Sequence, residues 1–364
     1  MNNQSSTPNT STTLGIDLGD KRHSICALDG SADIIDERSI TNHRESLRRL
    51  SEKHPGATIA MEVGSQSPWI SRFFASRGHE VIVANPRKLR AIYSNTRKSD
   101  RHDACILARL ARVDPNLLHP IQHCTEQAQR DLLQIKLRDN LVSQRVDVIN
   151  SVRMTVKSLG IRLPKHCTST FGRRCRECLA GEHQEILAMI EPSLTAVEAL
   201  NAGISHFDKA ILETCARYPV TEKLMKIRGV GPITALTFVL VIFDPERFLS
   251  TRNVAAYLGL VPRRDQSGDT DKQLRISKTG NAYLRRLLVS AAQYLLGPFG
   301  KDPLGEDCDL RRHGLRLAEM GGARAKKKAV VAVARKLAVL MLTLWREDLD
   351  YDPLHLAKQT AEAA

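Results

Sequence analysis

The stretch LGIDLGDK, residues 14–21, decides the fold of the N-terminal part of this chain. Successive side chains of a β-strand point to opposite faces. The apolar residues of the stretch therefore share one face, whereas Asp17 lies between Gly15 and Gly19 on the other. A carboxylate in a buried strand is costly unless a hydrogen-bond donor or a metal meets it. The face that the glycines keep open is therefore a candidate site.

The sequence that follows predicts a mixed β-sheet covered by helices. The expected elements, in chain order, are strands over 13–29 and 34–40, a helix over 44–53, a strand over 58–63, a helix ending at Gly78, a strand ending at Pro86 and a helix over 97–113. Thr41 or Asn42 is expected to cap the first helix. Three strands followed by helix, strand, helix, strand and helix is the element order of a ribonuclease H-like fold.

Glu62 repeats the setting of Asp17 on a second strand. In TIAMEV, residues 58–63, Ala60 and Glu62 share one face and the larger apolar residues share the other. Each acid also has an ordinary interpretation, Asp17 as a satisfied turn residue and Glu62 as a solvated residue at a strand end. Two strands that each carry one acid on a small-residue face favour a shared site.

Asp100 and Asp103 add two acids from a helix. They lie three residues apart on one helix face, which Leu107 and Leu110 continue, so both are expected to point toward the sheet. Asp100 also follows Ser99 at a helix start, where an acid simply favours the dipole. Four converging acids would repel one another unless cations bind. Hard oxygen ligands in that number suit two Mg²⁺ ions, the usual clamp for displacement at phosphorus.

A competing interpretation of GIDLG is the first phosphate loop of actin-like sugar kinases, which share the core fold. Those enzymes also need a second phosphate turn rich in Asp and Gly, and no such hairpin follows in this sequence. The helical DRHDA stretch does not belong to that pattern either.

The charge of the chain favours nucleic acid as its partner. The 364 residues have a formal net charge of +14, and a field of that sign concentrates polyanions. A membrane partner is not expected, because no apolar run reaches about 18 residues and the N-terminus lacks the pattern of a signal peptide. Residues 1–12 are expected to form a disordered polar tail. We expect a cytoplasmic protein.

The eight cysteines lack the dense spacing of a secreted disulfide scaffold, so reduced thiols are expected. One cluster can be weighed as a zinc site, since five ligand-type residues lie within 18 positions: His166, Cys167, Cys175, Cys178 and His183. The spacing matches no common zinc module. Free thiols on a basic linker are therefore preferred, with a structural zinc at Cys167, Cys175 and Cys178 as the alternative.

Residues 124–217 are expected to form an α-helical coiled-coil arm. Over 125–159 apolar residues recur every seven positions, at Ile135, Val142, Ile149 and Val156. The intervening Arg138 and Arg145 make the seam imperfect, so an ordinary amphipathic helix in a bundle is the alternative. A second helical stretch is expected over 182–217 with an interruption near Pro192. The arm separates two chemical domains, 13–123 and 218–350, and is a natural dimerisation element.

The C-terminal domain, 218–350, predicts a mainly α-helical fold that contacts nucleic acid. Gly229, Gly231 and Thr234 are typical of a helix-hairpin-helix, whose backbone N–H groups hold a phosphate; a plain helical hairpin is the alternative. A short helix, a basic polar loop and another helix follow. Seven basic residues crowd this patch: Arg263, Arg264, Lys272, Arg275, Lys278, Arg285 and Arg286. Residues 351–364 are expected to form a tail.

Together these motifs resemble the DEDD transposases of bacterial insertion sequences. The resemblance is carried by GIDLGDK, AMEVGS and KSDRHDA, then by IRGVGPITA and GLVPRRDQSG with ISKTGNAYLRRLL, and it runs from about residue 13 to 350. It implies a first domain similar to the RuvC Holliday-junction resolvase and a homo-oligomer, dimer or tetramer. It also implies that a structured guide RNA, the bridge RNA, directs recombination of DNA.

The resemblance further implies that a serine of the C-terminal domain attacks DNA. The matching residue is Ser267 in DQSG, where many relatives have Ser-Ser-Gly. From chemistry alone Ser267 is a turn serine, and a hydroxyl is a poor nucleophile unless a base or a metal activates it. The expected mechanism has Mg²⁺ on the four acids, attack by Ser267 and a covalent serine–DNA intermediate. A hydrolytic, structure-specific nuclease and a non-enzymatic DNA-binding protein remain as alternatives.

Overall fold

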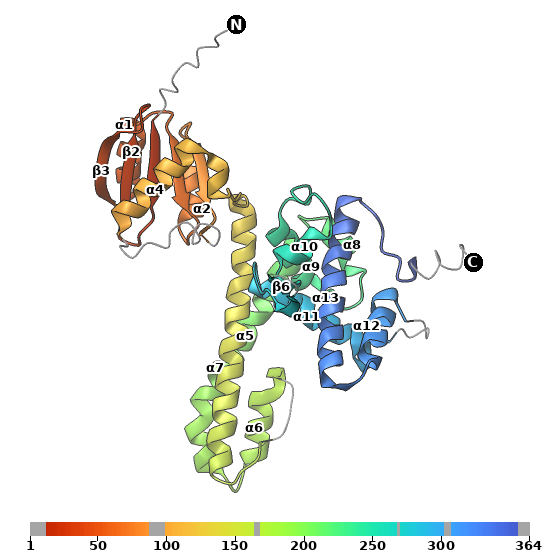
Figure 1. Cartoon of the computed structure of the whole chain (residues 1–364). Helices are drawn as coiled ribbons and strands as arrows, with labels where there is room; N and C mark the ends of the chain where they lie inside the picture. The colour runs from red at the N-terminus through yellow and green to blue at the C-terminus, as the bar shows by residue number, and fades with distance from the viewer. Residues whose placement is uncertain (1–11, 87–98, 164–167, 268–269, 302–306, 356–364) are drawn as a thin grey trace, which may run out of the picture. The chain divides into compact units, whose positions relative to one another are not determined.

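The computed structural model describes residues 12–86, 99–163, 168–267, 270–301 and 307–355, and these fall into two compact units that divide after Glu126 (Figure 1). The first unit contains a five-stranded sheet in the order β3-β2-β1-β4-β5. Its strands are β1 (Thr13–Asp17), β2 (Arg22–Leu28), β3 (Ile34–Thr41), β4 (Thr58–Glu62) and β5 (Glu80–Ala84). The first three pair antiparallel, whereas β4 and β5 run parallel to β1, which confirms the predicted mixed sheet.

Each face of this sheet carries its own helical layer. Leu14 and Ile16 of β1 pack in one core with residues of α1 (Arg44–Lys53) and α2 (Ser67–Ala75). The opposite face carries α4 (Asp100–Val113). There Ala104 and Ala108 pack against Cys26 of β2. The alternation read from LGIDLGDK therefore separates the two layers, because the large residues take one face and the small residues the other.

Gly15 determines how closely α4 approaches the sheet. A Cβ atom on Gly15 would lie 1.9 Å from the carbonyl oxygen of Ala104 and 2.6 Å from the backbone nitrogen of Ala108. The helix backbone thus occupies the space that any other side chain would need. Asp17, two residues along the same face of β1, is consequently held close to α4.

We expect Gly15→Ala to destabilise the first unit strongly. The new methyl group meets backbone rather than a movable side chain, and overpacking typically costs about 1–3 kcal/mol. Gly64→Ala is the matched control, since no atom lies within 4 Å of its added Cβ. Thermal unfolding followed by circular dichroism should show a lowered transition for Gly15→Ala alone. Equal transitions for the two variants would contradict the close approach.

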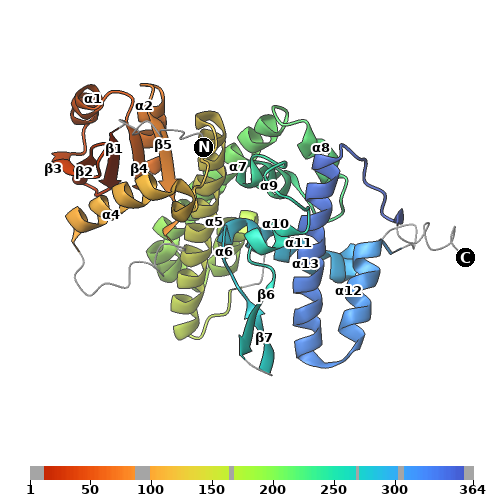
Figure 2. The ribbon, with the colours of Figure 1, turned by 45° about the horizontal axis from the view of Figure 1, so that its top comes forward.

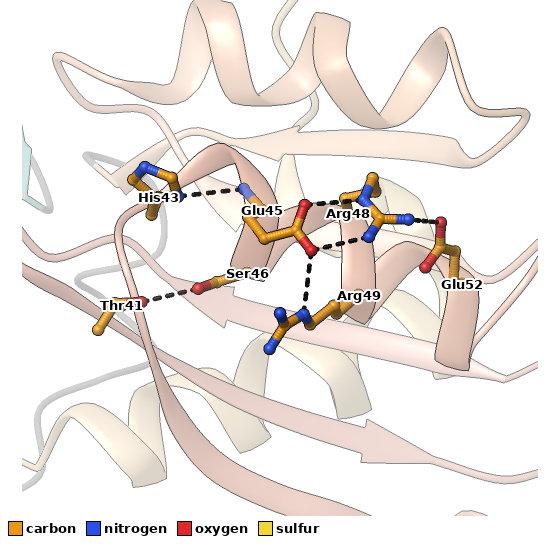
Figure 3. Close-up of polar contacts among 7 residues, drawn as sticks. All are labelled: Thr41, His43, Glu45, Ser46, Arg48, Arg49 and Glu52. Carbon is orange, nitrogen blue, oxygen red and sulfur yellow. Dashed lines mark hydrogen bonds and ion pairs between the residues drawn. The ribbon is translucent and has the colours of Figure 1, made fainter.

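The cap of α1 differs from the prediction. His43 caps this helix, and its Nδ1 accepts a hydrogen bond from the backbone N–H of Glu45 at 3.3 Å (Figure 3). The Thr41 hydroxyl bonds instead to the Ser46 hydroxyl at 2.7 Å. The Asn42 side chain donates to the carbonyl of Asp20 at 2.8 Å. Asn42 was the wrong candidate because a long-range contact to the β1–β2 turn engages its side chain.

Salt bridges on α1 reinforce its first turns. Glu45 accepts from Arg48 at 2.7 Å and from Arg49 at 3.1 Å, and Arg48 also pairs with Glu52 (Figure 3). The hydrogen bonds from Arg48 and then Arg49 lower the pKa of Glu45 to about 2. These contacts are exposed, so their net contribution to stability is small.

The second unit begins with a helical hairpin. Helices α5 (Glu126–Ser158) and α7 (Gln184–Cys215) run antiparallel, because Arg138 bonds to Asp208 at 2.9 Å and Arg145 to Asn201 at 2.8 Å. The two arginines that interrupt the apolar seam thus contact polar residues of the neighbouring helix. Whether the pair supercoils stays a prediction. Helix α6 (Phe171–Leu179) packs against both near the end of the hairpin.

The predicted interruption of this hairpin near Pro192 was wrong. Pro192 lies inside α7, which is one continuous element. Ile190 and Leu194, on either side of it, are buried in the core with Phe171 of α6. A proline inside a helix costs about 3 kcal/mol, and burying side chains of this size offsets that cost at about 1.5–3 kcal/mol each.

The rest of the second unit is mainly helical. Its helices are α8 (Val220–Met225), α9 (Pro232–Ile242), α10 (Asn253–Tyr257), α11 (Ala282–Leu296), α12 (Asp309–Glu319) and α13 (Gly322–Arg346). Phe238 of α9, Leu288 of α11 and Leu337 of α13 lie in their common core. Among the described residues, no helix is both long and apolar enough to cross a membrane.

The basic loop predicted between α10 and α11 is instead a β-hairpin, which Figure 2 shows projecting from the helices. Its strands are β6 (Pro262–Ser267) and β7 (Thr270–Ile276), and they pair antiparallel. Arg264 bonds to Asp271 across the hairpin at 2.7 Å. The strands were missed because their polar residues follow no alternation, and cross-strand pairing rather than burial supports them.

Candidate active site

Asp17 and Glu62 lie next to each other at the ends of adjacent parallel strands. Ile16 is paired with Met61, so Asp17 and Glu62 are the residues that follow in β1 and β4. Neighbouring strands lie about 4.8 Å apart. Both acids are half-buried, and both share a face with residues that contact α4, Gly15 in β1 and Ala60 in β4.

Helix α4 runs antiparallel to β1. Near its C-terminal end the Arg112 guanidinium donates to the carbonyl of Gly30, in the turn after β2. That turn lies at the start of β1, because Leu28 is paired with Thr13. The N-terminal end of α4 therefore lies toward Asp17.

Asp100 and Asp103 lie in this first turn of α4. Ser99 caps the helix, and its hydroxyl accepts from the backbone N–H of His102 at 3.2 Å. Ala104 lies over Gly15. Asp100 lies about 6 Å before Ala104 along α4, and Asp17 lies about 7 Å beyond Gly15 along β1. Because α4 and β1 run in opposite directions, the acids of the helix and those of the strands lie at about the same height along the sheet. Asp103 is half-buried, whereas Asp100 is exposed. The four predicted acids thus lie toward one end of the sheet, on the side that α4 covers.

The chemistry of this carboxylate set fits a hard divalent cation, which prefers oxygen ligands. Within the described parts of the chain, no three His, Cys, Asp or Glu side chains lie together closely enough to hold a metal ion. Carboxylates repel one another when no cation lies between them. A preformed metal cluster is therefore not part of this arrangement, although its donors lie on three neighbouring elements.

A polar contact that sequence reasoning missed fixes the chain just after Glu62. The Ser67 hydroxyl accepts from the backbone N–H of Gly64 at 3.0 Å and lies 2.9 Å from Nε2 of His123. Burial, together with the charge of Arg72, lowers the pKa of His123. His123 is therefore neutral near pH 7 and binds Ser67 as an uncharged partner. Its only sequence signal was a lone histidine after the sheet.

Of the thiols weighed as a zinc site, Cys175 and Cys178 are described, and they differ in exposure. Cys175 is buried against Phe171 in the core of the helical hairpin, whereas Cys178 is exposed. Burial, with the neighbouring Cys178, raises the pKa of Cys175 to about 11, which keeps it a neutral thiol rather than a thiolate ligand. His166 and Cys167 lie outside the described residues.

Ser267 is the last residue of β6 and is exposed. It is paired with Thr270, the first residue of β7, so it lies at the far end of the hairpin from Pro262. Ser277, the next serine along the chain, has a hydroxyl 3.0 Å from that of Thr279 in the turn before α11. The two serines therefore differ in setting, Ser267 at a projecting tip and Ser277 in a turn contact.

The glycines predicted to bind phosphate have unequal roles. Gly229 has a φ of +83°, and a Cβ there would lie 3.1 Å from the carbonyl of Ala291, so it packs against α11. Gly231 has no atom within 4 Å of such a Cβ and precedes α9. Thr234 is only 8% exposed, so a contact there would use its backbone N–H. The helix-hairpin-helix stays a prediction.

The predicted basic patch divides into internal and outward residues. Arg285 donates to the carbonyls of Leu258 and Thr279, and Arg286 bonds to Asp139 of α5 at 2.5 Å. Arg264 is engaged by Asp271 within the hairpin. These three arginines therefore make contacts within the second unit. The remaining four are exposed: Arg263, Lys272, Arg275 and Lys278.

Comparisons with known proteins point in one direction. The family profile of DEDD transposases of the IS110 type matches residues 14–161, and a profile described as Transposase IS116/IS110/IS902 family matches residues 221–301. The transposase for insertion sequence element IS1111A of Coxiella burnetii is 25% identical over 335 residues, covering 91% of this chain and 88% of that protein.

Two further relatives extend this picture. The putative transposase y4qE of Sinorhizobium fredii is 29% identical over 332 residues, which cover 85% of this chain and 81% of the relative. The pilin gene-inverting protein of Moraxella lacunata is 24% identical over 360 residues, covering 94% and 98%. The four acids lie within the first profile match and Ser267 within the second.

Proposed function

We propose, since the chain belongs to the IS110 family of DEDD transposases, that it recombines DNA at an insertion sequence through a covalent serine intermediate. The observation that carries the proposal is the placement of Asp17 and Glu62 on adjacent parallel strands, toward the end where α4 begins with Asp100 and Asp103. Carboxylates so placed are typical of phosphoryl transfer.

The proposed chemistry is two exchanges at phosphorus. The Ser267 oxygen attacks the scissile phosphate, so that a P–Oγ bond forms while the P–O3′ bond breaks. The serine proton is given up to a base and the leaving 3′-oxygen takes up a proton. In the second exchange, the 3′-hydroxyl of another strand attacks the phosphoserine, which restores Ser267 and joins the new strands. No net hydrolysis occurs.

Asp17, Glu62, Asp100 and Asp103 are the residues that would hold divalent cations, for which we propose two Mg²⁺ ions. Such ions, when bound, stabilise the charge that develops on a phosphate under attack. Asp17 and Glu62 are fixed by strand pairing, whereas Asp100 and Asp103 are fixed by the cap and first turn of α4. The proposed reaction requires Ser267 of the second unit to meet these acids, within one chain or between copies.

We extend the proposal to two partners. A net charge of +14 favours polyanionic partners in general, and we propose a structured guide RNA in addition to DNA because the family resemblance implies one. A dimer or tetramer is supported by apolar residues left exposed on α5, among them Leu133 and Leu137, which lie four residues apart on one face. The proposals of a guide RNA and of an oligomer are both based on the family resemblance, together with the net charge and the exposed leucines respectively.

The alternative function is hydrolytic cleavage by the same acids with water as the nucleophile. The exposed position of Ser267 at a hairpin tip favours the covalent route, because a tip can reach a strand that lies outside its own unit. The deciding experiment incubates the protein with cognate DNA, guide RNA and Mg²⁺ and resolves the products on a denaturing gel. A protein–DNA adduct is expected, and cleaved DNA without any adduct would favour hydrolysis.

We expect nucleic-acid affinity to fall steeply with salt. Each phosphate that a Lys or Arg neutralises releases counterions, so log K falls with log salt in proportion to the number of contacts. Between about 50 and 200 mM salt, six to ten contacts would lower affinity roughly 10³- to 10⁵-fold. Fluorescence anisotropy with labelled DNA and RNA measures this slope, and a flat response would remove the basic surface as the docking face.

A further inference from the structure

A groove of about 1270 Å³ lies in the second unit, between the base of the hairpin and the two C-terminal helices. Pro262, Leu274 and Ile276 of the hairpin line one side. Val331 and Leu340 of α13 line another. The floor is thus apolar, although the groove lies in a strongly basic part of the chain.

Lysines and arginines surround this floor. Arg252, Arg275 and Lys278 border it on the hairpin side. Lys327, Lys328, Arg335 and Lys336 border it from α13, where they recur at spacings that keep them along one side of a helix. Asp309 and Asp352 are the acids among its lining residues. Seven cations against two acids leave a strongly positive surface.

The acids in the described parts of the chain do not neutralise these cations. Within the described residues, none of the seven forms an ion pair, whereas Arg264, Arg286 and Arg312 nearby each do. Asp309, one of the two acids, is already engaged by Arg312 at 2.7 Å. Uncompensated charges repel one another, so this arrangement costs stability unless an anion binds.

A groove with an apolar floor and a cationic rim should bind single-stranded and duplex nucleic acid with different affinities. A duplex presents phosphates and base edges, with its base faces stacked inside, and gains little from an apolar surface. A single strand can lay unstacked bases on such a floor while its phosphates meet the rim. The groove therefore favours a single strand over a duplex.

The position of Ser267 favours DNA as this strand. The hairpin that lines the groove at Pro262 carries Ser267 five residues further on, at its tip. Five residues of strand span about 17 Å, which equals about five stacked nucleotides at 3.4 Å each. A strand joined to Ser267 can thus extend along the hairpin to the groove.

From this arrangement we infer that the groove is a binding site for single-stranded DNA, holding the strand about five nucleotides away from the scissile phosphate. The choice of DNA rests on the function proposed above, whereas the preference for an unpaired strand rests on the floor and the rim. Lys327 and Lys328 contact phosphates, and Leu274 contacts a base.

The test compares two double variants of the full-length protein that change charge equally. Lys327→Glu with Lys328→Glu reverses two cations of the groove, whereas Arg324→Glu with Lys326→Glu reverses two exposed cations of the same helix that do not line it. The probe is a fluorescein-labelled, mixed-sequence DNA strand of 20 nucleotides, followed by anisotropy over a salt series. The same sequence as duplex and as RNA provides two further arms.

We expect the groove variant to lose about tenfold or more in single-strand affinity and to lower the salt slope by about 1.4, the value for two phosphate contacts on a single strand. The control variant should change affinity less than about threefold. Leu274, which is 45% exposed, allows a test of the floor without a change of charge. Leu274→Ser should weaken binding of the single strand at high salt and leave duplex binding unchanged.

Four outcomes would overturn the inference. They are full single-strand affinity of the groove variant, equal losses in the two double variants, a loss confined to the duplex, and a loss for the RNA strand without one for DNA. Ser267→Ala keeps this result separate from the proposed function, because it should bind the strand normally whether or not serine is the nucleophile. If the groove variant binds the single strand with full affinity while Ser267→Ala cannot cleave DNA, the groove is not the binding site but the proposed role of Ser267 still holds.

Discussion

Ser267→Ala is expected to abolish both DNA cleavage and the protein–DNA adduct while leaving nucleic-acid binding intact. The substitution removes the attacking oxygen and changes neither the charge nor the packing of an exposed position. A denaturing gel with labelled cognate DNA, guide RNA and Mg²⁺ measures cleavage and adduct together. If water is the nucleophile, the alanine variant should still cut DNA, because the acids are untouched.

Ser277→Ala is the matched control for this experiment. The Ser277 hydroxyl contacts that of Thr279 in the turn before α11, so its loss should leave adduct formation in place. Mass spectrometry of the DNA-linked peptide identifies the attached residue directly. A link at Ser277 would move the nucleophile, whereas nicking by Ser267→Ala without an adduct would establish hydrolysis.

Asp17→Ala should reduce recombination by at least about a thousandfold, since removing a cation ligand removes charge stabilisation at the phosphate under attack. Asp103→Ala should have the same effect, because Asp103 is a proposed cation ligand in the first turn of α4. Affinity for DNA and RNA, measured by anisotropy, should stay nearly unchanged or rise slightly as a negative charge is lost. Asp17→Asn keeps the size of the side chain and separates charge from packing.

A control acid away from the site makes this result specific. Asp33 lies in the turn between β2 and β3, at the start of β1 and so at the opposite end from Asp17. Asp33→Ala changes net charge by the same amount and should recombine normally. Unimpaired recombination by Asp17→Ala or Asp103→Ala would refute the proposed role of the carboxylates, and weakened binding by both would assign them to docking instead.

The sequence predicted which residues share a face of each strand, because buried strands show an alternation of large and small residues. Large residues at Leu14 and Ile16 alternate with small or acidic ones, and the same alternation recurs around Glu62. Because side chains of a strand alternate between faces, this pattern assigned both acids to one face before any pairing was known. The helix over 44–53 followed in the same way from its apolar spacing.

The errors fall where contacts between distant residues outweigh local preference. Asn42 is a good helix cap by composition, yet its side chain bonds to the β1–β2 turn. Pro192 predicts a break, yet buried neighbours keep α7 continuous. The polar hairpin of β6 and β7 has no burial pattern to read, since cross-strand pairing holds it together.

The basic residues illustrate the same limit at the functional surface. The composition predicted a polyanionic partner. It could not show which basic residues form intramolecular ion pairs and which could bind a phosphate. Arg286 is engaged by Asp139, which lies 147 positions away, whereas Lys327 lines the groove without an ion pair among the described residues. The AKKK run at 325–328 was visible in the sequence, but its relation to the hairpin was not.

The sequence by itself determined the mixed sheet, the four acids, the positive charge and the resemblance that singles out Ser267, because each of these is a property of residue type and short-range spacing. Only the tertiary structure decided how closely α4 approaches Gly15, which arginines are engaged internally and where an apolar floor meets cations that form no ion pair with another described residue. These depend on which distant segments share a surface, and burial and ion pairing act between such segments. Their free energies are fixed when the chain packs, and no local pattern records them.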